Sequence, residues 1–343
     1  MPLVVLSAAS GRLVGGVDVP LLFDVDVTVK FLFALPLMIA AEPIVHGRVR
    51  ETVQELLDRG IVSPRDEPRF EAMVASAMRL RNSTIVEVTL LVLAFTAGYS
   101  IWRSTGAILS VPTWYSSPRG GFTAAGFWYA LVSQPLARFI LFRWYFRLLI
   151  WYVFSWKVSR LKLSLDALHP DRAGGVGFLE HTVITFSPVL IAQSSFAAGV
   201  IGNHIWHGGA KLPDFKFQII GLILFLTMQS LVPLTFFASQ LVKAKLKLTY
   251  ELGRLATLYA NDFGRKWLPG GEPRDEGLLG TGDIQSLADL ANSYQVLRSM
   301  RPVPFAARLP VRLAILIAVP MMPLALTMVP LDELLRGVLK LVM

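Results

Sequence analysis

Three arginines stand inside one of the most apolar and aromatic stretches of this chain. The run ARFILFRWYFRLLIW covers residues 137–151 and contains Arg138, Arg143 and Arg147. An arginine near the middle of a bilayer costs about 3 to more than 10 kcal/mol, so it usually has a charged partner, a water-filled cavity or the interface within reach. At about 100° per residue, Arg143 and Arg147 share one helix face, whereas Arg138 points elsewhere. This pair could attract anions or bind carboxylates.

Two glutamates could pair with these arginines from other apolar segments. Glu42 lies near the end of the first such segment, and Glu87 lies near the start of the second. If successive segments cross a membrane in opposite directions, both carboxylates lie near the same bilayer surface as Arg143 and Arg147. Ion pairs that hold the helices together would explain the four residues. A charged constriction, in which the arginines select anions or the glutamates relay protons, would also explain them.

The depth of Arg143 and Arg147 decides between these roles and a third. As one helix, residues 124–156 would measure about 50 Å, which exceeds the roughly 30 Å of hydrocarbon in a bilayer. If this helix crosses near its start, the two arginines snorkel to the cytoplasmic interface beside several Trp and Tyr residues. If it is centred lower, they face the interior of a helix bundle.

The most motif-like stretch is the loop LHPDRAGGVGFLEHT at residues 168–182. Its proline ends the preceding helix, and its glycines allow a tight turn directly before the next apolar segment. Free backbone N–H groups at a helix N-terminus beside an arginine could bind an anion or a phosphate. The alternative is a structural turn in which Asp171 and Arg172 bridge neighbouring helices. The candidate anion-binding residues are Arg172, Gly174, Gly175 and Gly177.

The last apolar segment contains three prolines, Pro320, Pro323 and Pro330. Each proline removes a backbone donor and kinks or breaks a helix. The carbonyl groups freed at membrane depth must then be buried in protein or line water. We expect either a broken helix beside a pathway or a kinked span that is followed by an amphipathic helix in the membrane interface.

The sequence contains no recognisable catalytic or metal-binding pattern. Cysteine is absent, which excludes disulfides and thiolate metal sites. His204 and His207 share one helix face, but two ligands do not make a metal site, so we expect interfacial histidines without a metal. No nucleophile elbow, zinc-protease motif or kinase motif is present. We therefore predict no catalytic residue and no cofactor.

The composition requires elements that lie in lipid. The chain has 343 residues, of which 54% are hydrophobic and 17% are charged, and its mean hydropathy is +0.54. Soluble domains carry about 25% charged residues and cannot bury so much apolar surface. We expect an all-α polytopic membrane protein with about six transmembrane helices and a helical cytoplasmic layer. The six apolar windows are 27–47, 84–102, 122–155, 182–204, 217–240 and 311–330.

The basic residues alternate between the segments that connect these windows. Segments 48–83, 156–180 and 240–312 hold 7, 4 and 11 Lys and Arg residues. The other connecting segments hold 1, 2 and 2. By the positive-inside rule, the three basic segments face the cytoplasm and the N-terminus lies outside.

Hydrophobic periodicity predicts helices in the basic segments as well. Leu248, Leu252, Leu255 and Tyr259 follow steps of four, three and four, so the fifth span should continue out of the membrane as one rod. Asp283 could cap a second helix after it. The predicted units are an N-terminal segment with the first span (1–47), a cytoplasmic helical pair (48–83), a four-span bundle (84–240), a cytoplasmic extension (241–310), and a proline-broken last span with an amphipathic helix (311–343).

Three stretches carry a family resemblance. The runs LHPDRAGGVGFL, GDIQSLADLANSYQVLRSM and LTMVPLDELL resemble an uncharacterised family of bacterial multi-pass inner-membrane proteins with an HPDRAGG-type loop. The likeness covers most of the chain from the first apolar window onward. It implies a location in the bacterial inner membrane, and it supplies no activity and no catalytic residue.

The leading functional expectation is an ion channel or pore-forming transporter in which anions are slightly favoured. Six spans with few polar residues can rarely enclose a pore alone, so we expect a homo-oligomer. Membrane lipids are the other expected partners, and nucleic acid is not expected. The alternatives are a membrane enzyme or accessory subunit that binds lipid head-group phosphate, and a non-catalytic assembly or sensor protein.

Overall fold

A computed structural model describes residues 2–105, 112–116, 121–268 and 282–328, with the backbone alone for 97–105. Within these ranges the chain forms helices, together with three isolated backbone bridges and no strand. The all-α prediction is confirmed for the part of the chain that the structure describes.

Three helical segments are long and apolar enough to cross a membrane, namely Val25–Asp58, Leu212–Thr235 and Leu309–Met328. A fourth results if Gly177–Thr185 and Ser187–Gly208, which are bent by 42° at Phe186, count as one broken span. These segments support a membrane protein. The first segment comprises α2 (Val25–Val29), η2 (Lys30–Ala34) and α3 (Leu35–Asp58), and the second comprises η5 (Leu212–Phe215) and α10 (Lys216–Thr235). The broken segment comprises η4 (Gly177–Leu179), α8 (Glu180–Thr185) and α9 (Ser187–Gly208), and the helices of the last segment are given below.

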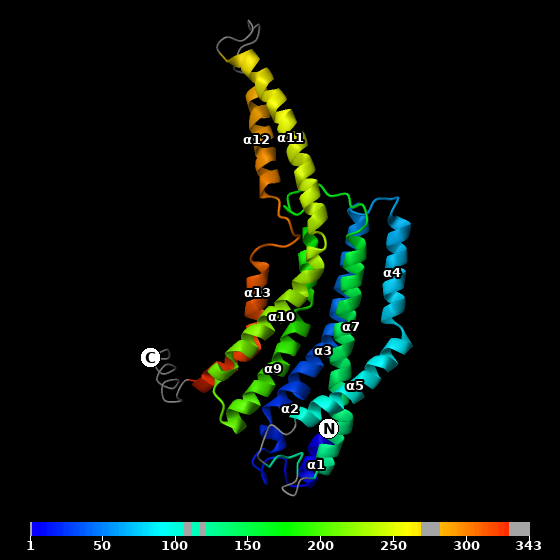
Figure 1. Cartoon of the computed structure of the whole chain (residues 1–343), viewed down its shortest axis with the longest axis vertical. Coiled ribbons are helices and arrows are strands. Elements are labelled where there is room, and N and C mark those ends of the chain that lie inside the picture. The colour runs from blue at the N-terminus through cyan, green and yellow to red at the C-terminus, as the bar shows by residue number, and fades with distance from the viewer. Residues whose placement is uncertain (1, 106–111, 117–120, 269–281, 329–343) are drawn as a thin grey trace.

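The other two predicted windows also form helices, but their composition does not establish a crossing. In α5 (Thr84–Thr105), the apolar helix with described side chains covers only Thr84–Thr96. The three arginines and the Trp and Tyr residues of α7 (Gln134–Val158) lower its hydropathy. Figure 1 shows α5 running obliquely across α7. The structure therefore has a helix in every predicted window and supports three or four of the six predicted spans.

Short helices and turns precede these elements near the N-terminus and before α7. The π-helical turn η2 lies against the π-helical turn η3, and the rings of Phe31 and Tyr129 meet edge to face with their centroids 6.3 Å apart. The remaining elements of this region are α1 (Pro2–Ala9), η1 (Leu21–Phe23), α6 (Ala124–Trp128) and η3 (Tyr129–Ser133).

The helical extension outside the apolar segments is a long hairpin. Helices α11 (Ala238–Trp267) and α12 (Asp283–Ser299) lie side by side and project beyond the rest of the molecule along its longest axis (Figure 1). Helix α4 (Glu67–Arg81) packs along α7, below the hairpin in Figure 1. The helices predicted for segments 48–83 and 240–312 are therefore present.

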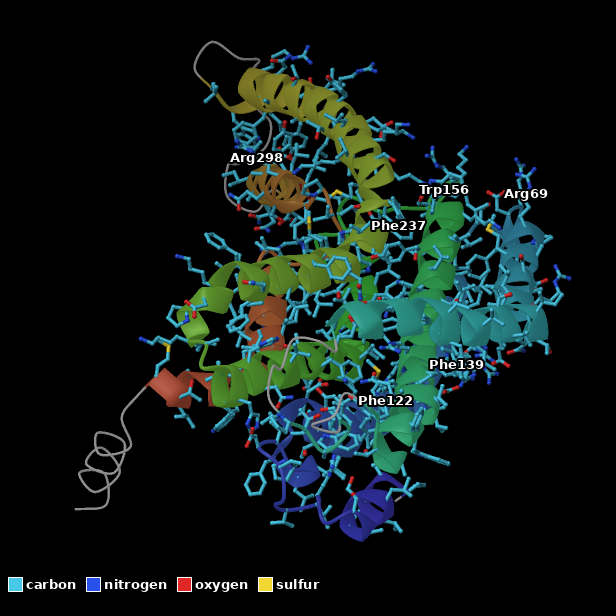
Figure 2. The ribbon with its side chains drawn as sticks, turned by 60° about the horizontal axis from the view of Figure 1, so that its bottom comes forward. Arg69, Phe122, Phe139, Trp156, Phe237 and Arg298 are labelled. Carbon is cyan, nitrogen blue, oxygen red and sulfur yellow. The ribbon has the colours of Figure 1, made fainter. Side chains whose placement is uncertain are left out.

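The predicted continuous rod from the fifth span is wrong, because a turn at Phe236 and Phe237 separates α10 from α11 (Figure 2). Pro233 explains the disruption, since it has no N–H to bond the carbonyl oxygen of Gln229 one turn earlier. The hydroxyl of Tyr152 on α7 donates to that freed carbonyl oxygen. A neighbouring helix thus satisfies the group that proline exposes.

The last span is broken, as its prolines predict. Helix α13 ends before the 3₁₀ turn that contains Pro320, and a second short helix then begins around Pro323. Beside this break, the hydroxyl of Ser194 on α9 donates to the carbonyl oxygen of Ile317, so a neighbouring helix satisfies a backbone group there. Pro330 lies outside the described residues. The elements are α13 (Leu309–Ala318), η6 (Val319–Met321), α14 (Met322–Ala325) and η7 (Leu326–Met328).

Helix α9 lies at the centre of the bundle, where two glycines let α2 approach closely. A Cβ atom at Gly199 would lie 3.0 Å from the Cα atom of Asp26, and one at Gly202 would lie 3.1 Å from Cγ1 of Val25. Larger residues would push the two helices apart.

Candidate functional site

Four charged side chains from three helices meet in one place, which we name the charge cluster: Glu42, Glu87, Arg143 and Arg147. Arg147 donates a hydrogen bond to the carboxylate of Glu42. Arg143 Nη2 lies 3.3 Å from Oε1 of Glu42, and its Nε lies 3.7 Å from Oε1 of Glu87. The structure therefore brings together the four residues that the sequence singled out. Their participation in a pathway stays a prediction.

Local structure explains why these side chains converge. Arg143 and Arg147 are one helical turn apart on α7, so both face α3. Glu42 lies in the middle of α3, and Glu87 lies in the first turn of α5, where the helix dipole favours a carboxylate. The guanidinium of Arg147 also lies 5.2 Å from the ring centroid of Trp144, which favours the cation.

A histidine and a fifth charged residue extend the charge cluster, and sequence reasoning missed both. Arg81 Nη1 lies 2.7 Å from Nδ1 of His46. His46 follows Glu42 by one turn of α3, and Arg81 lies in the last turn of α4. The spacing of Glu42 and His46 was a usable signal, whereas the approach of α4 depends on the tertiary fold.

The charge cluster is only partly enclosed. In the isolated chain, the side chains of Glu42 and Arg143 are each 39% exposed and that of Glu87 is 48% exposed, whereas Arg147 is 18% exposed. Ion pairs that served only to hold the bundle together would be expected to lie deeper in the protein. The outward side of the cluster is available to water, to a head group or to another chain.

The position of the charge cluster along its helices bears on its expected depth. Glu42 lies about 26 Å along the helix from Val25, and Arg143 lies about 28 Å along its helix from Ala124. Both distances approach the roughly 30 Å thickness of a hydrocarbon core. If the hydrocarbon core begins near Val25 and Ala124, the arginines could bind the glutamates and reach the interface at the same time; their depth stays a prediction.

Arg138 lies apart from the charge cluster. It is half-buried on α7, nine residues before Arg147, and it has no ion-pair partner among the residues that the structure describes. The sequence prediction that Arg138 points away from the other two arginines agrees with this placement.

The loop at 168–182 already contains an anion, which is the chain's own Asp171. The Asp171 carboxylate accepts hydrogen bonds from the backbone N–H groups of Ala173, Gly175 and Gly177 at 2.7, 3.2 and 2.8 Å. A Cβ atom at Gly177 would lie 2.9 Å from this carboxylate. The predicted anion site therefore has its principal donors occupied, which favours the structural-turn alternative.

The conformation of this loop explains the residue types of the HPDRAGG stretch. Gly174 and Gly175 have φ values of 68° and 89°, and Arg172 has a φ of 56°, which a residue with a side chain rarely adopts. Burial acts to raise the pKa of Asp171, but the backbone N–H groups and His169 outweigh it and hold that pKa below its usual value. The carboxylate thus stabilises the strained turn.

The same loop fixes the segment that connects α12 to α13. Arg301 donates through its backbone N–H to the carbonyl oxygen of Arg172 at 2.7 Å, and through Nη2 to that of Asp171 at 2.8 Å. Its guanidinium lies 3.8 Å from Glu180, which accepts from the backbone N–H of Ala306. We name these contacts the Arg301 clamp, because they join the base of the hairpin to the bundle.

A buried carboxylate at the opposite end of the bundle was also missed. Asp24 is 2% exposed and accepts hydrogen bonds from Trp114 Nε1 at 2.8 Å, Asn203 Nδ2 at 2.8 Å and the backbone N–H of Val27 at 3.1 Å. An aspartate directly before a helix is a capping signal, but its two distant partners are not readable from the sequence.

The histidines have contacts within the protein. His207 Nε2 lies 3.0 Å from the carbonyl oxygen of Phe23, and the ring centroid of His204 lies 5.8 Å from that of Phe215. Across the described ranges, no three His, Asp or Glu residues are grouped as a metal site would require.

No family model, curated protein or solved structure matches this chain.

Proposed function

We propose that this chain is a subunit of a homo-oligomeric ion channel or pore-forming transporter in the bacterial inner membrane. The N-terminus lies outside, and the basic segments 48–83, 156–180 and 240–312 lie in the cytoplasm. Three apolar helical segments support insertion in a membrane. The uneven distribution of Lys and Arg supports the orientation, and the family resemblance supports the location.

The observation that carries the proposal is the half-exposed charge cluster, which lies within α3 and α7 and at the start of α5. Exposed charges at this depth would contact acyl chains or head groups if the chain were alone in lipid. Neighbouring copies that enclose water would solvate the same charges at a much lower free energy. The cluster then lines the cytoplasmic mouth of a path between subunits.

The charge cluster itself is neutral, and the neighbouring Arg81 gives the site a net positive charge that favours anions. Arg81, Arg143 and Arg147 exceed Glu42 and Glu87 by one positive charge, and Arg143 keeps only long contacts of 3.3 and 3.7 Å with its carboxylates. A ring of such sites in an oligomer would attract anions toward the mouth. Tight binding of an anion would slow its passage, and the negative charges of the two glutamates would prevent such binding.

The lipid-phosphate alternative has weaker support, because Asp171 occupies the backbone donors beside Arg172. The assembly alternative differs from the channel in one respect: it gives the charge cluster a purely structural role. Flux measurements separate these two functions.

The test is ion flux in proteoliposomes under a KCl gradient. We expect a reversal potential near that of chloride for the natural protein, and a shift toward that of potassium for Arg143→Gln. The matched control is Arg79→Gln, which removes an exposed arginine of α4 outside the charge cluster. Absence of flux from a folded, oligomeric protein would contradict the proposal.

A second variant, Glu87→Gln, is measured in the same flux assay. We expect it to increase anion selectivity, because it removes a negative charge from the mouth. The control is Glu71→Gln on the exposed side of α4. An unchanged reversal potential in correctly folded Glu87→Gln would remove this residue from the path.

A further inference from the structure

The hairpin of α11 and α12 carries apolar side chains on its outer surface. On α11, Val242, Leu246 and Tyr250 are 39, 51 and 72% exposed. On α12, Val296 is 37% exposed. Exposed apolar residues on the membrane spans are covered by lipid, but under the proposed topology the hairpin lies in the cytoplasm, where lipid cannot cover them.

These residues of α11 form a second apolar face, distinct from the one that holds the hairpin together. Val242, Leu246, Tyr250 and Gly253 follow steps of four, four and three, so they share one side of the helix. The inner face is occupied, because Leu252 is buried and Leu248 packs with residues of α12 in the main core. Among the residues that the structure describes, none covers the outer face.

No contact within the described part of the chain explains Gly253. It lies in the interior of a 30-residue helix, where glycine is among the least favourable residues. A Cβ atom placed there would meet nothing within 4 Å. A glycine on an exposed apolar stripe is the residue that permits close approach of a second helix.

A charged residue follows each member of this face along α11. Lys243, Lys247 and Arg254 follow Val242, Leu246 and Gly253, whereas Glu251 follows Tyr250 and lies 3.9 Å from Lys247; all four charged residues are exposed. Two α11 helices packed against each other would place these basic residues together, which is unfavourable. Because Lys247 already has Glu251 as a partner, the surface that packs here should carry an acidic residue level with Arg254 and small side chains level with Gly253.

The exposed side of α12 meets both requirements. Asp289 and Asn292 are exposed there, and the small residues Ala288 and Ala291 directly precede them. Two intrachain contacts fix the relative heights of the helices: Lys245 Nζ donates to the carbonyl oxygen of Arg298 at 2.9 Å, and Tyr259 Oη donates to that of Asp283 at 2.9 Å. Arg298 is labelled in Figure 2 on α12, beside α11.

These contacts place Arg254 and Asp289 at nearly the same height. Between Lys245 and Tyr259 the two helices advance by similar numbers of residues, so Arg254 on α11 is level with Asp289 on α12. Copies in one membrane project their hairpins in the same direction, and rotation about the membrane normal preserves height. Arg254 of one copy then meets Asp289 of the next.

We propose that the outer face of α11, formed by Val242, Leu246, Tyr250 and Gly253, packs on the exposed side of α12 in a second copy of this chain. The contact is head-to-tail, so it continues around a ring and closes the oligomer outside the membrane. It rests on the homo-oligomer and the orientation given under the proposed function, and it names the surface that joins the subunits.

Cysteine cross-linking tests this contact directly, because the natural chain contains no cysteine. Gly253→Cys and Asn292→Cys are made as single variants of the full-length protein, reconstituted together and oxidised. We expect a disulfide-linked dimer from the mixture and none from either variant alone. A Glu71→Cys variant mixed with Asn292→Cys is the matched control, since α4 is outside the proposed contact.

Charge exchange provides the second measurement. We expect Arg254→Asp and Asp289→Arg each to lower the cross-linking yield by about threefold to fivefold, as loss of one exposed ion pair predicts. Both changes together should restore it. Cross-linking of Gly253→Cys with itself would overturn the proposal by showing an α11–α11 contact.

Failure of this contact can be distinguished from failure of the channel. An oligomeric protein that conducts ions but forms no Gly253–Asn292 cross-link overturns the proposed surface and leaves the proposed function intact. A monomeric protein without flux overturns both.

Discussion

Arg147 and Glu42 lie 105 positions apart in the sequence and form a charge-assisted hydrogen bond between α7 and α3. The Arg147 side chain is 18% exposed, so the loss of Glu42 would leave a mostly enclosed cation without its principal partner. This contact ties the first apolar helix to the arginine-rich one, and its contribution to stability can be measured.

We expect Glu42→Gln to lower the free energy of unfolding by about 1–2 kcal/mol, since a hydrogen bond to a charged group is lost at a partly exposed site. Thermal unfolding in detergent measures the effect. Glu51→Gln is the control, because its ion pair with Arg48 is 62 and 66% exposed and should contribute about 0–0.5 kcal/mol. Equal losses from the two variants would contradict a special role for Glu42.

We expect Gly177→Ala to destabilise the protein by about 1–3 kcal/mol, because the new Cβ atom would collide with the Asp171 carboxylate at 2.9 Å. Gly47→Ala should instead stabilise the protein by up to about 1 kcal/mol, since α3 gains a better helix former in open space. Unfolding of the two variants under the same conditions gives the comparison. A neutral Gly177→Ala would show that the loop can relax around Asp171.

Asp171 should make stability depend on pH in the acid range. Its pKa in the folded protein is held below the usual 3.8, so its contribution is fully present above pH 3.8 and is lost as the pH falls through the lowered pKa. We expect Asp171→Asn to lower stability at neutral pH and to flatten the acid limb of the stability profile. Asp58→Asn, an exposed aspartate at the end of α3, should keep that limb.

We expect Trp114→Phe to cost about 1–3 kcal/mol, because it removes the indole donor from a carboxylate that is 2% exposed. The matched control is Trp206→Phe, whose side chain is 60% exposed and should have a small effect. The two unfolding midpoints are compared in the same detergent. A loss at Trp206 as large as that at Trp114 would contradict the importance of the Asp24 contacts.

Much of the helical structure follows from local sequence. Apolar windows and periodicity predict a helix at each of the six expected positions, and Pro320 and Pro323 predict where the last span breaks. These features depend on residues within one or two helical turns. The convergence of Glu42 and Glu87 on Arg143 also follows from the sequence, because the expected spans place all three residues at a similar depth in the membrane.

Features that depend on distant partners could not be predicted. The glycines and Arg172 indicated free backbone donors, but whether Asp171 fills them depends on the path of the whole loop. Asp283 shows the same limitation. It was expected to cap α12, yet its carboxylate lies 2.9 Å from Trp267 Nε1 and 3.1 Å from Lys266 Nζ, so it binds α12 to α11 instead. In each case a carboxylate had several possible donors, and tertiary packing selected among them.

The exposure of side chains on α11 also differs from what the periodicity of its sequence predicts. Leu248, Leu252, Leu255 and Tyr259 fit one helical face, but Leu255 is 53% exposed while Leu252 is buried. Periodicity gives the direction of a side chain, whereas burial depends on the width of the partner helix. The exposure of Val242, Leu246 and Tyr250 depends on where α12 packs against α11, which the sequence does not indicate.

The Arg301 clamp gives the hairpin the mechanics of a lever. Helix α11 is about 45 Å long, whereas the clamp holds the hairpin within one or two residues of its base. A small rotation at the base would therefore move the tip of the hairpin a long way. A force applied at the tip would act on the Asp171 loop as a larger force over a shorter distance. The loop leads directly into α8 and α9, so the torque is delivered to the helix at the centre of the bundle.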